Sequence, residues 1–168
     1  MQGDYGDNGP HGFGTKTWKD GRRYEGQWAN GCQHGKGRFS EVNGNVYEGE
    51  FFAGKAEGEG VLKTAKGDVY AGQWQQGREW GEGVCQWADH RKYTGDWQGG
   101  KKHGQGCMMW PDGTGTRCFS GSHCVHSVWL MQSLEYDGVW VRGRRQGWGV
   151  FRWSDGSKYE GEWSKGKF

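Results

Sequence analysis

The tyrosines of this chain recur at a fixed interval. Tyr24, Tyr47, Tyr70 and Tyr93 are each 23 residues apart, and the same interval separates Tyr136 from Tyr159. Each of these tyrosines is followed by a glycine two residues later, an aromatic residue four residues later and another glycine seven residues later. A fixed period of this length is typical of repeat architectures, in which each unit buries its apolar surface against its neighbours.

Each repeat has the pattern of a β-hairpin. The Tyr-x-Gly-x-aromatic alternation predicts a first strand that carries ring, glycine and ring on one face. The later glycine, such as Gly54, permits the positive φ of a tight turn. A Gly-x-Gly pair then opens a second alternating strand, and a step such as Asn43-Gly44 turns the chain into the next tyrosine. The sequence therefore predicts an all-β fold, an elongated, single-layer, twisted antiparallel meander of tandem β-hairpin repeats.

The glycine content has a steric explanation in such a sheet. The chain holds 35 glycines and 12 tryptophans, while only 32% of its residues are hydrophobic. A single layer has no second layer to cover its rings, so each ring must lie flat over neighbouring strands. Glycine leaves the space that the ring fills. We therefore expect a thin aromatic core, with the glycines of the strands placed beneath the rings.

Two segments of the chain resemble the MORN (membrane occupation and recognition nexus) repeat. They are Tyr24-Glu-Gly-Gln-Trp-Ala-Asn-Gly and Tyr159-Glu-Gly-Glu-Trp-Ser-Lys-Gly, and His34-Gly-Lys-Gly adds the Gly-x-Gly pair. The resemblance extends over nearly all of 1–168 and implies the hairpin array described above. It also implies docking of a protein in an aromatic-lined groove, contact with phosphoinositides, or both, as well as self-association. In those MORN proteins that are enzymes, catalysis lies in a separate domain.

The repeat register divides 1–168 into units of unequal quality. Partial units at 1–23 and 159–168 flank regular units at 24–46, 47–69, 70–92, 93–118 and 136–158, and a degenerate unit lies at 119–135. Both ends look like pieces of something longer. An exposed terminal strand is a docking edge for another chain, so homodimers or end-to-end assemblies are expected.

The ring-bearing face is the first candidate site. The residues predicted to line a partner groove are Tyr47, Phe51, Tyr70, Trp74, Trp87, Tyr93, Trp97 and Trp110. One layer cannot cover twelve tryptophans on all sides, so part of each ring is expected to face an extended or helical partner segment. The favoured function is a non-enzymatic scaffold or adaptor in a cytoskeletal or membrane-apposed assembly, with selectivity supplied by the irregular segment 114–135.

Basic residues at the hairpin tips give an alternative. Lys101, Lys102, Arg142, Arg144 and Arg145 are the candidates for contact with an anionic phospholipid, at about 1 kcal/mol for each basic residue near the surface. In this alternative the chain reads phosphoinositides at a membrane surface. A second alternative is the regulatory domain of a larger enzyme such as a lipid kinase.

Catalytic and metal sites are not predicted. The histidines that precede a Gly-x-Gly pair are replaced in other repeats by glutamate, tryptophan or glutamine, so that position is not catalytic. Cys118, His123, Cys124 and His126 hold potential zinc ligands, but their spacing matches no standard finger and adjacent strand residues point to opposite sides. We expect no metal, no cofactor and no enzymatic activity.

Charge and hydropathy bear on partners and location. The net charge of +2 provides no global field to attract nucleic acid, which we do not expect as a partner. No leading apolar run follows Met1, and the longest uncharged apolar stretch is far too short to span a bilayer. Five cysteines at irregular spacing suit reduced thiols. The expected location is the cytoplasm, in association with the cytoskeleton, a membrane, a cilium or a flagellum.

Overall fold

The computed structural model describes residues 2–6, 9–111 and 134–168, with the backbone alone for residues 2–6. Two compact units make up the chain, Met1–Glu79 and Trp80–Phe168. All regular structure in the described residues is β-strand, as the sequence predicts. Because no helix occurs among them, none is long and apolar enough to cross a membrane.

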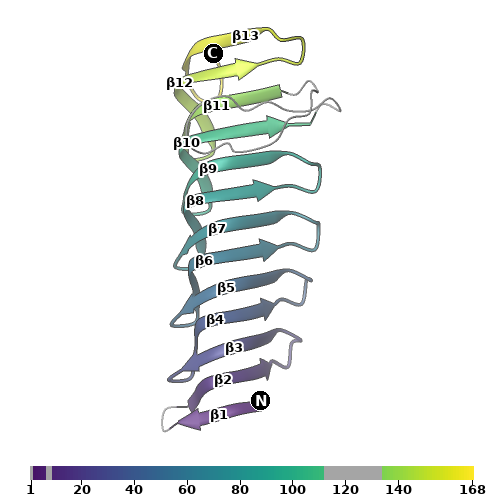
Figure 1. The fold of residues 1–168 in the computed structure, drawn as a ribbon, viewed down its shortest axis with the longest axis vertical. Helices are drawn as coiled ribbons and strands as arrows, with labels where there is room; N and C mark the ends of the chain where they lie inside the picture. The colour runs from purple at the N-terminus through teal and green to yellow at the C-terminus, as the bar shows by residue number, and fades with distance from the viewer. Residues whose placement is uncertain (1, 7–8, 112–133) are drawn as a thin grey trace. The chain divides into compact units, whose positions relative to one another are not determined.

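The first unit is a meander in which each strand pairs antiparallel with the next (Figure 1). Its strands are β1 (Gln2–Gly6), β2 (Gly9–Thr17), β3 (Arg23–Ala29), β4 (Cys32–Ser40), β5 (Val46–Phe52), β6 (Lys55–Lys63) and β7 (Val69–Gln75). Strand order in space follows strand order in the sequence, which confirms the predicted antiparallel hairpin meander.

The second unit repeats the arrangement. Its strands are β8 (Arg78–Gln86), whose first two residues belong to the first unit, β9 (Lys92–Gln98), β10 (Lys101–Trp110), β11 (Leu134–Val141), β12 (Arg144–Arg152) and β13 (Lys158–Trp163). Strands β10 and β11 pair directly, with Met108 opposite Tyr136, although residues 111–133 separate the two strands in the chain.

The hairpin tips after β3, β5, β7, β9 and β11 are two-residue turns in which both central residues have positive φ. At the tip between β3 and β4, Asn30 has φ 50° and Gly31 has φ 78°. This pair of left-handed residues matches the right-handed twist of the flanking strands. The glycine was predicted, but the residue before it was not. Ala53, Gln76 and Arg142 take that left-handed position in other repeats.

Tyrosine rings and glycines interlock on one face of the sheet, which we call the ring face. Tyr47 on β5 is only 6% exposed, and its ring meets Phe51 and Trp74 edge-on at centroid distances of 5.0 Å. A Cβ atom on Gly60 would lie 2.6 Å from two carbon atoms of the Tyr47 ring. The predicted steric role of the strand glycines is confirmed, because the ring occupies the space that a side chain would need.

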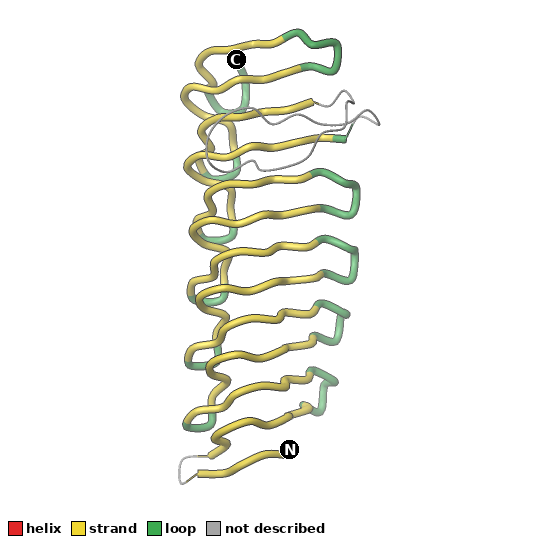
Figure 2. The backbone as a smooth tube through the Cα atoms, in the orientation of Figure 1, coloured by secondary structure: helices red, strands yellow, loops and turns green. Residues whose placement is uncertain are grey.

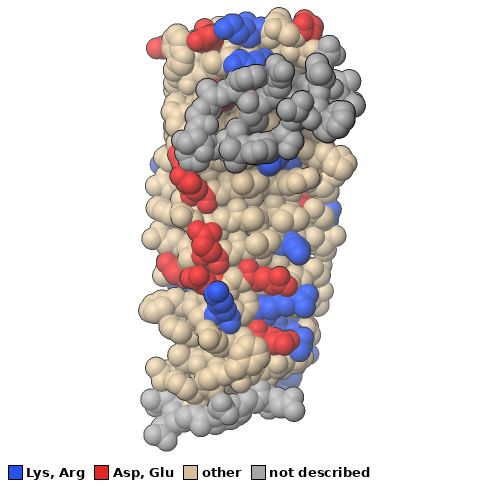
Figure 3. All heavy atoms as spheres, in the orientation of Figure 1, with Lys and Arg blue, Asp and Glu red and all other residues tan. Residues whose placement is uncertain are grey.

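The strands curve at the end that carries the hairpin tips, so that the tips lie behind the strand bodies in Figure 2. Rings on the outside of a curved single layer would be exposed. Because the first-strand rings are buried, the ring face must line the inside of the curve. The other face of the first unit carries acidic and basic side chains side by side (Figure 3). By strand alternation Arg38 and Glu48 point to this face, and they form an ion pair of 3.0 Å between β4 and β5.

Candidate functional site

The predicted groove residues fall into two classes of burial. The six first-strand rings are all buried, at 0 to 8% exposure: Tyr47, Phe51, Tyr70, Trp74, Tyr93 and Trp97. The expectation that their ring faces stay exposed is therefore wrong. Trp87 and Trp110, which come from the second half of their repeats, are half-buried. The part that any of these residues plays in binding a partner stays a prediction.

The polar atoms of the buried rings are satisfied inside the sheet. The Tyr47 hydroxyl donates to the Glu50 carbonyl oxygen at 3.0 Å, and the Trp74 indole donates from Nε1 to the Gly60 carbonyl oxygen at 3.1 Å. The same indole bond recurs at Trp28, Trp97, Trp140 and Trp163. Burial raises the pKa of Tyr47 well above its usual value. These rings form the structural skeleton of the sheet, and the hydroxyl and indole donors named above are already used within it.

A second set of large apolar side chains, all aromatic except Leu62, remains accessible on the ring face. These residues are half-buried and come from the second strands and the turns that follow them; we call them the second-strand row: Trp18, Phe39, Leu62, Trp87, Trp110, Phe151 and Trp153. Only Trp87 and Trp110 were among the predicted site residues. The others could have been found from the hairpin register, which sets Phe39 opposite Tyr24 and Tyr47. The second-strand row is therefore the accessible aromatic part of the ring face.

The five predicted basic residues also divide into two groups. Lys101, Arg142 and Arg144 are exposed at the hairpin tips, as expected. Lys102 and Arg145 are half-buried on the ring face, where the register sets Lys102 opposite Trp97 and Arg145 opposite Trp140. Because adjacent strand residues point to opposite sides, Lys101 and Lys102 cannot both belong to one tip surface. The prediction that Lys102 and Arg145 are tip residues is wrong.

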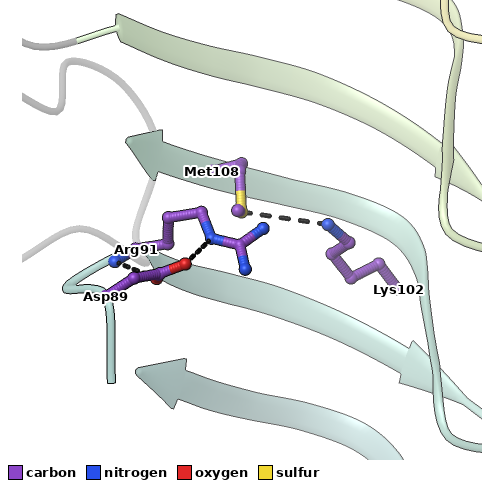
Figure 4. Close-up of polar contacts among 4 residues, drawn as sticks. All are labelled: Asp89, Arg91, Lys102 and Met108. Atoms are coloured by element: carbon purple, nitrogen blue, oxygen red, sulfur yellow. Dashed lines mark hydrogen bonds and ion pairs between the residues drawn. The ribbon is translucent and has the colours of Figure 1, made fainter. Parts of the chain in front are cut away.

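Lys102 lies within a group of aromatic rings in the second unit. Its Nζ atom is 4.3 Å from the Trp140 ring centroid, 5.5 Å from that of Tyr93 and 5.6 Å from that of Trp87. Figure 4 shows Nζ directed at the Met108 sulfur, 3.8 Å away. Burial, assisted by the positive charge of Arg91, lowers the pKa of Lys102 to about 8. A cation is held here mainly by ring faces.

Arg145 occupies the equivalent place one hairpin further along. Its guanidinium carbon is 4.2 Å from the Trp163 ring centroid, 5.4 Å from that of Phe151 and 5.6 Å from that of Tyr136. The Nη2 atom donates to the Gly166 carbonyl oxygen at 2.9 Å. Burial lowers the pKa of Arg145, although a guanidinium remains charged at any physiological pH.

Neither cation has an acidic partner in the described residues. Arg91 is paired with Asp89 at 2.7 Å (Figure 4), but no ion pair involves Lys102 or Arg145 in the part of the chain that the structure describes. The ring face of the second unit thus combines aromatic surface with two positive charges that lack a protein counter-charge there.

The described residues 9–111 and 134–168 contain no group of three or more side chains that could hold a metal ion. Cys118, His123, Cys124 and His126 lie outside the described residues, as do residues 114–133 of the irregular segment 114–135 to which selectivity was assigned.

Comparison with known proteins identifies the repeat. The family model described as "MORN repeat" matches residues 2–22, 24–46, 47–69, 70–90, 93–115, 136–158 and 159–168. These segments cover most of the chain, and six of the seven lie on the tyrosine register described above. A comparison with curated proteins gives no match.

Proposed function

This chain belongs to the MORN-repeat family, and we propose that it is a non-enzymatic scaffold that holds a protein partner against its ring face. The observation that carries the proposal is the difference in burial between the first-strand rings and the second-strand row. The first-strand rings from Tyr24 to Trp140 are buried, and the tyrosines and tryptophans among them are hydrogen-bonded, whereas the second-strand row stays half-buried. Aromatic surface of this kind is enriched at protein interfaces.

Ring contacts within the second-strand row favour binding because they limit the side-chain freedom that a partner would otherwise have to remove. Trp110 contacts Phe151 at a centroid distance of 6.1 Å, and Phe151 contacts Trp153 at 4.9 Å. Rings held against one another lose little conformational entropy when a partner arrives. A segment that lies across the strands would meet these rings one after another.

The test uses peptides selected from a random display library against the whole chain. Their affinities are then measured on variants with Trp87→Leu and Trp110→Leu. Loss of one well-packed ring costs at least about 1 kcal/mol at an interface, so the double variant should weaken binding by about tenfold or more. The matched control is Trp148→Leu, since Trp148 is 59% exposed and lies on the opposite face of the same unit. Selected peptides that bind the ring-face variant as well as the wild type would contradict the proposal.

The membrane alternative retains one specific observation, the exposure of Lys101, Arg142 and Arg144 at the hairpin tips. Three basic residues at about 1 kcal/mol each give weak attraction to an anionic surface. Flotation with vesicles containing a few per cent phosphatidylinositol bisphosphate tests it, and the effect should disappear in K101Q/R142Q/R144Q. Tip-dependent flotation would place membrane contact beside protein docking in one cytoplasmic, membrane-apposed assembly.

The remaining expectations are proposals of lower rank. They comprise self-association through strand edges, a cytoskeletal or ciliary assembly, and a regulatory role beside a lipid kinase. Sedimentation of the purified chain over a range of concentrations tests the first.

A further inference from the structure

Two cations on the ring face of the second unit specify the chemistry of the partner. We propose that this face selects an acidic segment whose carboxylates bind Lys102 and Arg145. The inference rests on the proposed function, because it presumes that a protein segment lies on the ring face. It adds the charge of that segment and the spacing of its acidic side chains.

Unused donors at both positions support the assignment. A lysine ammonium carries three N–H donors and a guanidinium carries five. In the described residues the only hydrogen bond from Lys102 Nζ goes to the Met108 sulfur at 3.8 Å, which is a weak acceptor. Among the residues that the structure describes, the Arg145 guanidinium donates only from Nη2, to the Gly166 carbonyl oxygen. A carboxylate would supply the charge-assisted hydrogen bonds that the rings cannot.

Partial desolvation makes such a carboxylate more favourable here than at a hairpin tip. Ring faces have replaced part of the water around both cations, so the local dielectric constant is lower than at the exposed tips. Attraction between opposite charges increases as the dielectric constant falls. A carboxylate would therefore gain more from Lys102 than from its exposed neighbour Lys101.

The register fixes the spacing between the two carboxylates. Lys102 on β10 and Arg145 on β12 face the same side at the same repeat position, with β11 between them. Two inter-strand steps separate positions of this kind by about 10 Å. Acidic side chains about seven residues apart lie on one face of a helix and span that distance. In an extended segment of the polyproline II kind, which has three residues per turn, acidic side chains about three residues apart do the same.

The location of the cations favours a peptide over a bilayer. Both lie against rings on the inside of the curved sheet, where a narrow segment can enter and a planar surface cannot. The basic residues that a bilayer would meet are at the tips, Lys101 and Arg144. These neighbours in the sequence therefore provide a charge-matched control on the other side of the strands.

The experiment measures fluorescence anisotropy with labelled alanine-leucine helical peptides at physiological salt. In the helical set, one peptide carries two glutamates seven residues apart, a second carries glutamines at the same two positions and a third carries lysines there. A second set of three extended peptides carries the same residues three positions apart. We expect the better glutamate peptide to bind the unaltered chain about tenfold tighter than its glutamine counterpart, and the lysine peptide to bind weakest. The K102Q/R145Q variant should lose the preference for glutamate over glutamine, whereas K101Q/R144Q should keep it. The K102R variant, which retains a cation at position 102 and leaves Arg145 unchanged, should also keep it.

The outcomes separate the inference from the proposed function. Equal binding of glutamate and glutamine peptides, still weakened by Trp87→Leu and Trp110→Leu, would overturn the inference alone. Failure of every peptide to depend on those tryptophans would overturn the proposed function as well. Vesicle flotation that is lost in K102Q/R145Q and retained in K101Q/R144Q would assign the two cations to a lipid headgroup and overturn the choice of partner. Because the three peptides are compared on the unaltered chain, the charge preference is measured even if a variant does not fold.

Discussion

Gly60 provides a direct test of the idea that tyrosine rings determine where glycine is required. This residue lies on β6 opposite Gly49, and a Cβ atom there would overlap the ring of Tyr47. Its backbone is not in the left-handed region, so any cost of Gly60→Ala must come from the ring. Gly54 at the neighbouring tip is the converse case, with φ +80° and no atom within 4 Å of an added Cβ.

The expected magnitudes differ accordingly. At Gly54, alanine adds a left-handed strain of about 1–2 kcal/mol, partly offset by about 0.4–1 kcal/mol of lost freedom in the unfolded chain. At Gly60, overpacking costs about 1–3 kcal/mol. Displacement of Tyr47 adds about 1 kcal/mol for its hydrogen bond to the Glu50 carbonyl. We expect Gly54→Ala to lower the free energy of unfolding by about 1 kcal/mol and Gly60→Ala by about 3 kcal/mol.

A double-mutant cycle shows whether the ring is the cause. Tyr47→Leu removes the ring atoms that the new methyl group would meet, at a cost of its own. In that background Gly60→Ala should be neutral or stabilising by about 0.5–1 kcal/mol, because alanine loses less entropy than glycine in a strand. The coupling between the two sites should therefore exceed about 2 kcal/mol. Urea denaturation followed by circular dichroism measures it, and an equal cost of Gly60→Ala in both backgrounds would refute the steric explanation.

Three further predictions concern other positions. His90 has φ 68° at a turn position where other repeats have a glycine: Gly21, Gly44, Gly67 and Gly156. His90→Gly should therefore increase the free energy of unfolding by about 1 kcal/mol and raise the thermal midpoint. An unchanged midpoint would contradict this. Phe51 lacks the indole N–H that donates to a glycine carbonyl oxygen in five other repeats. Phe51→Trp should therefore gain a hydrogen bond to the Gly37 carbonyl oxygen, worth about 1 kcal/mol. The new tryptophan should have blue-shifted fluorescence emission, and red-shifted emission would show that its ring lies in solvent. Burial lowers the pKa of Lys102 from 10.5 to about 8, so the unfolded chain binds more protons between these values and stability should rise with pH from about 8 to about 10. Above that range the buried tyrosines reverse the trend, because burial raises their pKa values. Urea midpoints measured across this pH range should rise with pH in the wild type. If the midpoints of Lys102→Met rise in the same way, the increase in stability belongs to another titrating group.

The features fixed by local chemistry were predictable from the sequence. The tyrosine interval gave the repeat, alternation gave the strands, and the glycine after the first strand gave the turn. The space required by a large ring explained glycine within the strands, and Gly60 beneath Tyr47 confirms that argument. Each of these features depends on contacts within one hairpin or between adjacent strands, which the repeat spacing reports directly.

Burial of the rings was not predictable in the same way, because it depends on the curvature of the sheet. A flat layer would have left Tyr93 and Trp97 partly open, whereas the curved sheet leaves them 0% and 8% exposed. The period of a sequence carries no measure of curvature. The orientation of Lys102, in contrast, was available: a two-residue turn at Gly99-Gly100 sets Lys102 opposite Trp97, and hence on the ring face. It was missed because the basic residues were grouped by closeness in sequence and not by side of the strand.

The position opposite the first-strand aromatic ring is where the repeats differ most in chemistry. In the first unit Gln33 faces Trp28 and Ala56 faces Phe51, and both of these side chains are uncharged. In the second unit Lys102 and Arg145 occupy it. The rings and glycines around it are constrained by packing, but this position only has to lie over a ring face, which neutral and cationic side chains both do. A repeat can therefore change the charge that it offers a partner without disturbing its skeleton. It follows that the preference for glutamate peptides over glutamine peptides should be transferable between repeats. Ala56→Lys should introduce this preference in the first unit. If it does not, more than this one position sets the charge selectivity.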